Sequence, residues 1–119
     1  MALLSHARTG KGAFVEVSLL QAAISSLVNQ ATNWLIAKKL PEKQGSHHPN
    51  IAPYGDTFRT ADGMEILLAV GNDKQFAELC GVLNLANIVE DIRFRTNPAR
   101  VQYRNELKGI LESKISNRI

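Results

Sequence analysis

An Asp-Gly dipeptide between two strand-like runs is the feature that most constrains how this chain can fold. Asp62 and Gly63 separate residues 56–60 from the run MEILLAV at 64–70. The dipeptide suits the positive φ angles of a tight primed turn, so the two runs are predicted to pair as an antiparallel hairpin. The second arm is almost continuously apolar, which predicts a strand that is covered on both faces.

A helix is predicted to follow the hairpin directly. Asn72 and Gln75 have the spacing of a helix N-terminal capping pair. The next apolar residues recur at i, i+3, i+4 and i+7, which predicts an amphipathic helix whose apolar face covers the sheet. They are Phe76, Leu79, Cys80 and Leu83.

The C-terminal part is predicted to be helical as well. Residues 84–90 indicate a tight turn and a short helical piece, and Asn97-Pro98 has the chemistry of a helix cap and first turn. An apolar stripe then marks a final helix. Its members are Tyr103, Leu107, Ile110, Leu111 and Ile115.

One long helix is predicted in the N-terminal part. Ser18 and Gln21 form a capping-box pattern, and apolar residues recur on one helical face up to about Lys39. Residues 1–8 have the pattern of a helix end, residues 9–12 that of a helix stop, and residues 13–17 (AFVEV) that of a short strand. The predicted fold class is α+β, with a strand and long helix in 1–40 and a small domain with an antiparallel sheet and flanking helices in 41–119.

The composition limits what the chain can do. With 119 residues and 45% hydrophobic content it can form one small core. A net charge of +3 is small for a dedicated nucleic-acid binder, which we keep only as a third alternative, and the polar residues of the long helix argue against a membrane span. A single cysteine, Cys80, cannot form an internal disulfide, so we expect a reducing compartment, with the cytoplasm as the first choice.

Several motifs, in one order, resemble a known enzyme family. The runs HPNIAPY at 48–54, FRTADG at 58–63, LLAVGNDKQF at 67–76 and DIRFRTNPARVQYRNEL at 91–107 are similar to the middle of the class III CoA-transferases. This CaiB/BaiF-type superfamily includes formyl-CoA transferases and α-methylacyl-CoA racemases. The run RTGKGAFVEVSLLQAA at 8–23 continues the resemblance upstream, so it covers essentially the whole chain.

The resemblance implies an enzyme that moves CoA between an acyl-CoA thioester and a carboxylic acid through an acyl–aspartate anhydride, on a homodimer of interlocked chains. It also implies that this chain is a fragment of a larger α/β enzyme, in which residues 1–40 come from the edge of the large domain. The catalytic aspartate would lie before Met1, so no catalytic residue is expected here. Coenzyme A thioester is the expected substrate, and no covalently bound cofactor is expected.

Three residues are candidates for substrate binding. His48 and Asn50 lie in a loop at 45–54 that matches the glycine-rich loop of the formyl-CoA transferases, which closes over the acylated intermediate. Their side chains can donate and accept hydrogen bonds, and a purely structural turn is an equally good interpretation. Asp73 matches a catalytic acid or base of the racemases with a one-residue gap, although the helix dipole also favours a carboxylate there.

Other combinations of reactive residues are less specific. His6, His47, His48 and Cys80 lack the spacing of metal ligands, so no metal site is predicted. Cys80 lies on the apolar helix face, which favours a buried thiol over a nucleophile. Four arginines could meet CoA phosphates or mark a solvated or interdomain face. They are Arg93, Arg95, Arg100 and Arg104.

The alternative to an enzyme fragment is an independent oligomerisation or protein-interaction module without catalysis. A longer reading frame upstream with an aspartate loop would favour the enzyme, whereas a true start at Met1 would favour the module.

Overall fold

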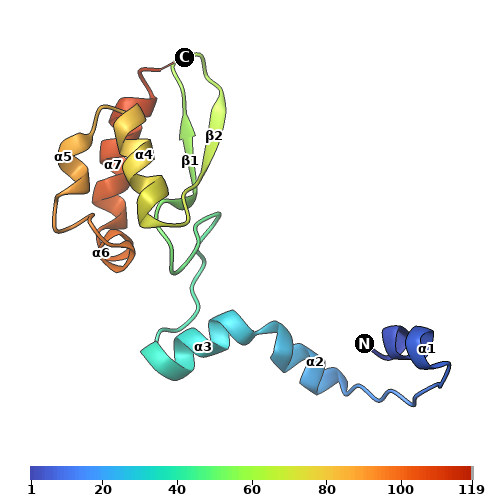
Figure 1. Ribbon diagram of the computed structural model, residues 1–119. Helices are drawn as coiled ribbons and strands as arrows, with labels where there is room; N and C mark the ends of the chain where they lie inside the picture. Colours follow the sequence, from blue (N-terminus) through green and yellow to red (C-terminus); the bar gives the residue numbers. More distant parts are fainter. Residues whose placement is uncertain (119) are drawn as a thin grey trace. The chain divides into compact units, whose positions relative to one another are not determined.

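The computed structural model describes residues 1–118 and divides the chain into two compact units, Met1–Glu42 and Lys43–Ile119 (Figure 1). The fold class is α+β, because an antiparallel pair of strands is combined with several helices. Among the described residues, no helix combines the length and the apolar character that a membrane crossing requires.

The first unit is made of helices. Helix α1 (Ala2–Thr9) ends at Gly10, whose φ of 69° is left-handed and whose N–H donates to the His6 carbonyl. This confirms the predicted helix stop. Helices α2 (Leu19–Ser26) and α3 (Val28–Ala37) then follow.

Two predictions for this unit are wrong. Residues 13–17 form no strand, because a strand needs a hydrogen-bonded partner and none of residues 1–118 pairs with them. The long helix is divided at Leu27, whose N–H donates to the Ile24 carbonyl three residues back. Just before the break, the Ser26 hydroxyl donates to the Ala23 carbonyl at 2.7 Å, a side-chain bond that competes with the helix ladder.

The predicted hairpin is confirmed in the second unit. Strands β1 (Tyr54–Arg59) and β2 (Glu65–Ala69) are antiparallel, with Phe58 opposite Ile66 and Arg59 opposite Glu65. The turn differs from the primed type that we predicted, because Gly63 has a φ of 83° and Asp62 does not adopt a positive φ.

The turn is a three-residue loop instead. The Thr60 N–H donates to the Met64 carbonyl at 2.9 Å and the Gly63 N–H donates to the Thr60 carbonyl at 3.0 Å, the arrangement of a type I turn followed by a left-handed glycine. The Asp62 carboxylate accepts from the Thr60 hydroxyl and from the Met64 N–H, and these bonds lower the pKa of Asp62.

A β-bulge interrupts the other end of the hairpin. Tyr54 is opposite Ala69 and Thr57 is opposite Leu67, so β1 uses one residue more than β2 between these pairs. The extra residue falls at Gly55 and Asp56, and Gly55 has a φ of 79°. At and beyond the bulge Asp56 and Phe58 are buried, whereas Tyr54 before it is 38% exposed.

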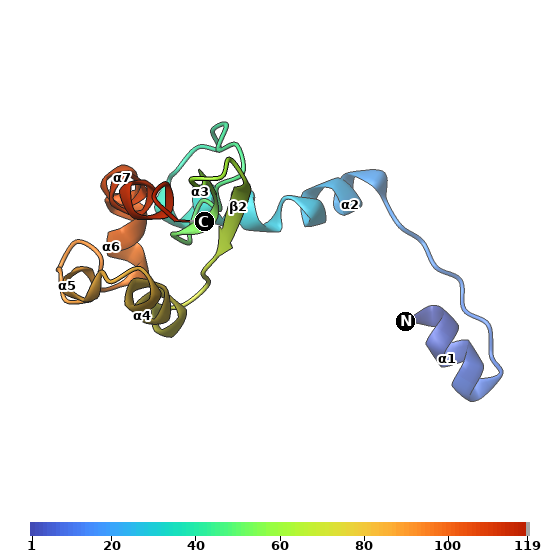
Figure 2. The same ribbon diagram turned by 90° about the horizontal axis from the view of Figure 1, so that it is seen from above.

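Four helices cover one side of the hairpin, as Figures 1 and 2 show. They are α4 (Asp73–Val82), α5 (Ala86–Val89), α6 (Asn97–Gln102) and α7 (Arg104–Ile115). The predicted cap of α4 is confirmed, since the Asn72 side chain accepts from the Gln75 N–H at 2.9 Å. The cap of α6 is Thr96 and not Asn97, and a break at Tyr103 separates α6 from α7.

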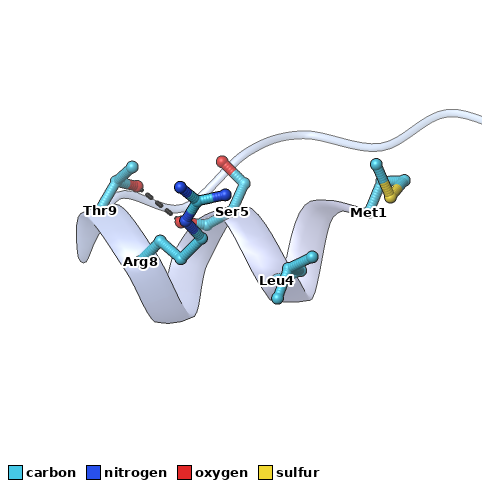
Figure 3. Close-up of a pocket in the computed structure, with 5 residues that line it drawn as sticks. All are labelled: Met1, Leu4, Ser5, Arg8 and Thr9. Carbon is cyan, nitrogen blue, oxygen red and sulfur yellow. Dashed lines mark hydrogen bonds between the residues drawn. The ribbon is translucent and has the colours of Figure 1, made fainter.

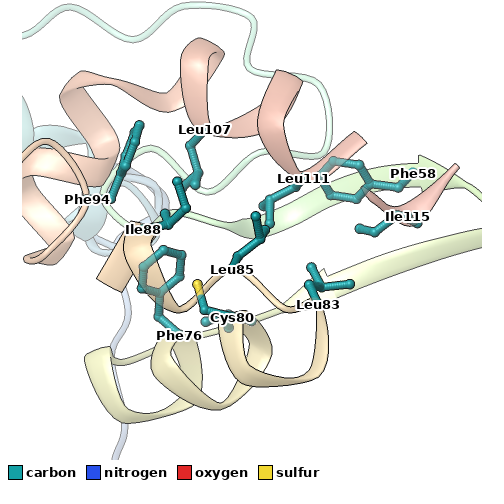
Figure 4. Packing of buried hydrophobic residues seen from close by; sticks show 11 residues of the cluster. Phe58, Phe76, Cys80, Leu83, Leu85, Ile88, Phe94, Leu107, Leu111 and Ile115 are labelled. Carbon is teal, nitrogen blue, oxygen red and sulfur yellow. The ribbon is translucent and has the colours of Figure 1, made fainter. Parts of the chain in front are cut away.

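The core lies between these helices and the hairpin (Figure 4). It contains the predicted apolar faces of α4 and α7. Its main members are Phe58, Phe76, Cys80, Leu83, Leu85, Ile88, Phe94, Leu107, Leu111 and Ile115.

Strand β2 is not covered on both faces, so that prediction is wrong for the described residues. Within β2, Ile66 is 37% exposed and Leu67 is 57% exposed. The reason is that the helices of this unit lie on one side of the hairpin, which leaves the other face without a covering layer (Figure 2).

Candidate functional site

The loop at residues 46–54, which we call the clamped loop, enters β1 and is held by side chains from α6 and α7. Asn97, Arg100 and Arg104 are spaced at i, i+3 and i+7, so they lie on the same side of these consecutive helices. Each binds backbone groups of the loop. Such bonds fix the path of the backbone without using the loop's own side chains.

Asn97 binds the loop through both ends of its amide. Its Nδ2 donates to the Asn50 carbonyl at 2.7 Å and its Oδ1 accepts from the Ala52 N–H at 3.1 Å. The side chain is available for this because Thr96, and not Asn97, caps α6. A residue predicted as a helix cap therefore serves as a loop contact.

Arg100 is a buried arginine, only 1% exposed. Its Nε donates to the Ala52 carbonyl at 2.8 Å, and its terminal nitrogens donate to the Phe94 carbonyl at 2.9 Å and to Asp73 at 2.6 Å. The guanidinium also lies 4.4 Å from the centre of the Phe76 ring. The cost of burying this charge is offset by four partners, which join the loop to the start of α4.

Arg104 connects the loop to the hairpin. It donates to the carbonyls of His48 and Ile51, and its other terminal nitrogen lies 3.5 Å from Oδ2 of Asp56. Asp56 is 1% exposed, and its carboxylate comes from the bulge of β1. The bulge thus brings a negative charge under the loop, and Arg104 compensates it.

His47 contacts the second oxygen of the same carboxylate. Its Nδ1 lies 2.7 Å from Oδ1 of Asp56, and both atoms are buried without a hydrogen-bond partner of regular geometry. The short distance requires a proton between them, and a carboxylate can only accept, so Nδ1 is the donor. His47 was considered in the sequence only as a metal ligand, and its pairing with Asp56 was missed.

Gly55 allows the loop to pass close to the hairpin. A Cβ atom placed on Gly55 would lie 1.9 Å from the Ser46 carbonyl oxygen, well inside any real contact. The His48 N–H also donates to the Tyr54 carbonyl at 2.9 Å, which closes the loop on itself. The clamped loop is therefore fixed from both sides.

Two of the predicted site residues lie on this loop. His48 is partly buried, its Nδ1 accepts from the Asn50 N–H at 3.1 Å, and its ring meets the Tyr54 ring edge-on. Because Nδ1 of neutral His48 is an acceptor, its Nε2 carries the proton and is a donor. Asn50 is exposed beside it.

The third predicted residue, Asp73, lies at the start of α4. Its side chain is 63% exposed, and one oxygen accepts from Arg100. Asp73 is therefore linked to the clamped loop through Arg100, which also binds the Ala52 carbonyl.

The arginines of this region are mostly engaged by the protein. Arg100 and Arg104 bind loop carbonyls, so they form neither a solvated face nor a row of free cations. Arg93 pairs with Asp91 and Glu106, both at 2.7 Å. The side-chain hydrogen bond to Asp91 raises the pKa of Arg93, and the hydrogen bonds from the Arg93 side chain and N–H lower the pKa of Asp91.

Other candidates in the sequence gain no support as sites. Within residues 1–118, no three His, Cys, Asp or Glu side chains are grouped as a metal site would require. Cys80 is fully buried, and this burial raises the pKa of its thiol, in agreement with a structural role. A hollow on α1, lined by Met1, Leu4, Ser5, Arg8 and Thr9, has walls from one helix alone (Figure 3).

Known proteins similar to this chain share one family. The sequence model of CoA-transferase family III matches residues 1–119. The chain is 39% identical over 117 residues to the succinyl-CoA:glutarate CoA-transferase of Mus musculus, covering 98% of this chain and 26% of that protein. It is 41% identical over 113 residues to the succinate–glutarate CoA-transferase of Agrobacterium fabrum, covering 95% of this chain and 28% of that protein.

A solved structure agrees with this. A CaiB/BaiF family protein from Brucella suis is 40% identical, with a TM-score of 0.62, over 98% of this chain and 30% of that protein. The chain thus spans between a quarter and a third of the length of these relatives. Since the family match extends along the whole sequence, the chain belongs to the class III CoA-transferase family.

Proposed function

We propose that this chain is the loop-bearing part of an enzyme that moves CoA between an acyl-CoA thioester and a carboxylic acid. Two findings support the proposal: the family match over residues 1–119, and the relatives named as CoA-transferases. The observation that carries it is the clamped loop, because three side chains from α6 and α7 fix its backbone. Rigid presentation of a loop is typical of binding sites.

In this proposal His48 and Asn50 bind the substrate. The Nε2–H of His48 is a donor that fits a carboxylate or a thioester carbonyl oxygen. Asn50 lies on the same turn, and its amide can both donate and accept. Asp73 completes the set at the start of α4, where its free oxygen fits a donor such as an amide N–H of the CoA arm.

The nucleophile of the transfer is supplied by sequence outside these residues. Relatives are about three to four times longer than the stretch they share with this chain, since that stretch is 26% and 28% of two of them. None of Asp56, Asp62, Asp73 and Asp91 lies in the sequence context that the family resemblance gives to the nucleophile. We therefore propose that the chain works as a segment of a longer polypeptide. We also propose that this polypeptide is a homodimer in the cytoplasm.

A second function, that of an association module, is favoured by one observation. Helices α2 and α3 expose large apolar side chains, including Leu20 at 68%, Leu35 at 66% and Ile36 at 79%. Such a surface marks contact with other protein. It fits both a subunit interface within the enzyme and an independent module.

A segment exchange separates the two functions. The matching stretch of the Agrobacterium fabrum enzyme is replaced by residues 1–119, and transfer of CoA from succinyl-CoA to glutarate is measured, because these acids appear in the names of the relatives. We expect the chimera to transfer CoA and the isolated chain to show none, since no covalent step is possible without the nucleophile. A folded chimera without activity, beside an active parent, would favour the association module.

A further inference from the structure

Two adjacent histidines of the clamped loop are held in opposite tautomers. His48 accepts a hydrogen bond at Nδ1, whereas Nδ1 of His47 lies 2.7 Å from the buried carboxylate of Asp56, an approach that requires a proton on Nδ1. In a neutral imidazole the second nitrogen takes the complementary role. The loop therefore presents a donor at Nε2 of His48 and an acceptor at Nε2 of His47.

The tautomer of His47 is fixed by the surroundings of Asp56. The side chain of Asp56 is 2% exposed, and its other oxygen faces Arg104, which can only donate. Oδ2 of Asp56 therefore faces Arg104, and Oδ1 faces Nδ1 of His47. A carboxylate has no proton to donate, so the proton of this contact belongs to Nδ1. The arrangement is that of a carboxylate that orients an imidazole.

Nε2 of His47 is the reactive end of this pair. The side chain is 29% exposed, and within the described residues Nε2 makes no hydrogen bond and is not a buried atom. The charged groups linked to His47 are Asp56, which contacts it, and Arg104, which contacts Asp56; His48 is its neighbour in the sequence and pairs with the Tyr54 ring. Of these, Asp56 acts on His47 directly, Arg104 acts on Asp56, and His48 directs its own Nδ1 to the Asn50 N–H.

The substrates of CoA transfer offer few donors for such an acceptor. Carboxylates and thioester carbonyls only accept, so the available donors are the amide and hydroxyl groups of the CoA arm, its adenine amine and the thiol. Only the thiol gains or loses its proton during the transfer. It is also a poor nucleophile until it loses that proton.

We propose that Nε2 of His47 takes up the thiol proton of coenzyme A and returns it in the reverse step, and that Asp56 positions the imidazole. This inference depends on the proposed function. When the thiol attacks the acyl carbonyl of an anhydride, the S–C bond forms, the C–O bond to the enzyme carboxylate breaks, and the thiol proton passes to Nε2. In the reverse step the departing sulfur takes this proton back from the imidazolium.

The first test is the tautomer, measured on the 119-residue chain by long-range ¹H–¹⁵N NMR of the histidines at a pH of about 8, where ordinary histidines are neutral. We expect His47 to carry its proton on Nδ1 and His48 on Nε2. Asp56→Asn should reverse the tautomer of His47, because the amide oxygen will face Arg104 and the amide NH₂ will donate to Nδ1. An Nε2–H tautomer of His47 in the unmodified chain would overturn the pairing, and this holds even if Asp56→Asn does not fold.

The second test is activity in the segment-exchange chimera. His47→Gln keeps a polar side chain but cannot take up a proton, so kcat should fall about 100- to 10,000-fold with KM for succinyl-CoA nearly unchanged. His6→Gln, the same change on the exposed helix α1, is the control and should keep full activity.

The two possible failures are distinguishable. A chimera that transfers CoA with its rate unaffected by His47→Gln overturns the role of His47 and leaves the proposed function intact. A folded chimera without any transfer overturns the proposed function, whatever the tautomers are. Recovery of a His47→Ala chimera by added imidazole would support proton exchange over a structural role, and the absence of recovery in an otherwise folded variant would count against it.

Discussion

At the scale of single residues, Gly55 and Gly63 make a matched pair. Their φ angles are nearly equal, 79° and 83°, so alanine is equally strained at both. They differ in space, because a Cβ on Gly55 meets the Ser46 carbonyl oxygen at 1.9 Å whereas a Cβ on Gly63 meets nothing within 4 Å. The comparison therefore isolates the close approach of the clamped loop from backbone strain.

We predict that Gly63→Ala lowers the free energy of unfolding by about 1 kcal/mol and Gly55→Ala by about 3 kcal/mol or more. Gly12→Ala is the control, because Gly12 has no positive φ and no neighbour near a new Cβ. Urea denaturation of the three variants measures this. Equal losses for Gly55→Ala and Gly63→Ala would mean that the loop does not pass against Gly55 as described.

Cys80 gives a prediction about pH. Burial raises the pKa of its thiol from the ordinary value of 9.0, and the nearby charge of Arg100 opposes this only in part. The unfolded chain therefore loses the thiol proton first as the pH rises, so stability is full below pH 9.0 and falls above it.

Replacing the thiol should remove this part of the loss of stability at alkaline pH. Cys80→Ala is expected to be less stable than the parent at neutral pH, because it leaves a small cavity, but less sensitive to pH above 9.0. Thermal unfolding at several pH values tests it. Identical alkaline slopes for the two proteins would contradict a buried, neutral thiol.

At the scale of elements, the anchoring of the clamped loop to α4 and α6 depends on Arg100. Arg100→Met should lower the free energy of unfolding by about 2 to 5 kcal/mol, because the buried carbonyls of Ala52 and Phe94 lose their donor. Asp73→Asn removes the charge of the carboxylate that Arg100 binds, yet it should cost less than about 1 kcal/mol because the Asp73 side chain is 63% exposed.

The same two variants, measured by urea denaturation, indicate what Asp73 is for. A large loss of stability with Asp73→Asn would show that this residue is primarily structural. A small loss leaves its carboxylate available for the substrate role proposed above.

The elements that could be predicted from the sequence are those with local signals. Asp62-Gly63 marked the hairpin, and Asn72 with Gln75 marked the start of α4. The predicted strand at 13–17 is absent, because a strand depends on a partner that the local sequence does not reveal. The predicted burial of β2 on both faces was wrong for a related reason. An apolar run shows that a strand can be buried, but it does not show which neighbouring layers are present to cover it.

The candidate site was predictable only in part. His48 and Asn50 were found through the loop, but the side chains that hold the loop act on backbone groups 45 to 56 residues away. Such contacts leave no periodic pattern. The i, i+3, i+7 spacing of Asn97, Arg100 and Arg104 was the available signal, and it was read as a cap and a charged face.

At the scale of the whole molecule, the exposed apolar side chains of α2 and α3 predict self-association. Leu19 is 90% exposed and Ile36 is 79% exposed, and no residue of the first unit is buried in the single chain. Light scattering of the isolated chain should give a mass above the 13.1 kDa of one copy, rising with concentration.

A variant with Ile24→Glu and Leu35→Glu should reduce this association, since both residues lie on the exposed helices and are 58% and 66% exposed. Glu at exposed helix positions leaves the helices intact, because its helix propensity is good. A strictly monomeric parent chain at high concentration would contradict the prediction.

The central claim is that the clamped loop serves CoA transfer, and the rate of the segment-exchange chimera with Arg104→Lys tests it most directly. Lysine keeps the charge of Arg104 but cannot reach two carbonyls and the Asp56 carboxylate together, so the loop should be displaced. Arg59→Lys is the control, because Arg59 is 71% exposed and pairs with Glu65 on the hairpin surface. We predict a fall in kcat/KM for succinyl-CoA of about 10- to 100-fold with Arg104→Lys and no change with Arg59→Lys. A folded Arg104→Lys chimera that transfers CoA as fast as the unmodified chimera would contradict the claim.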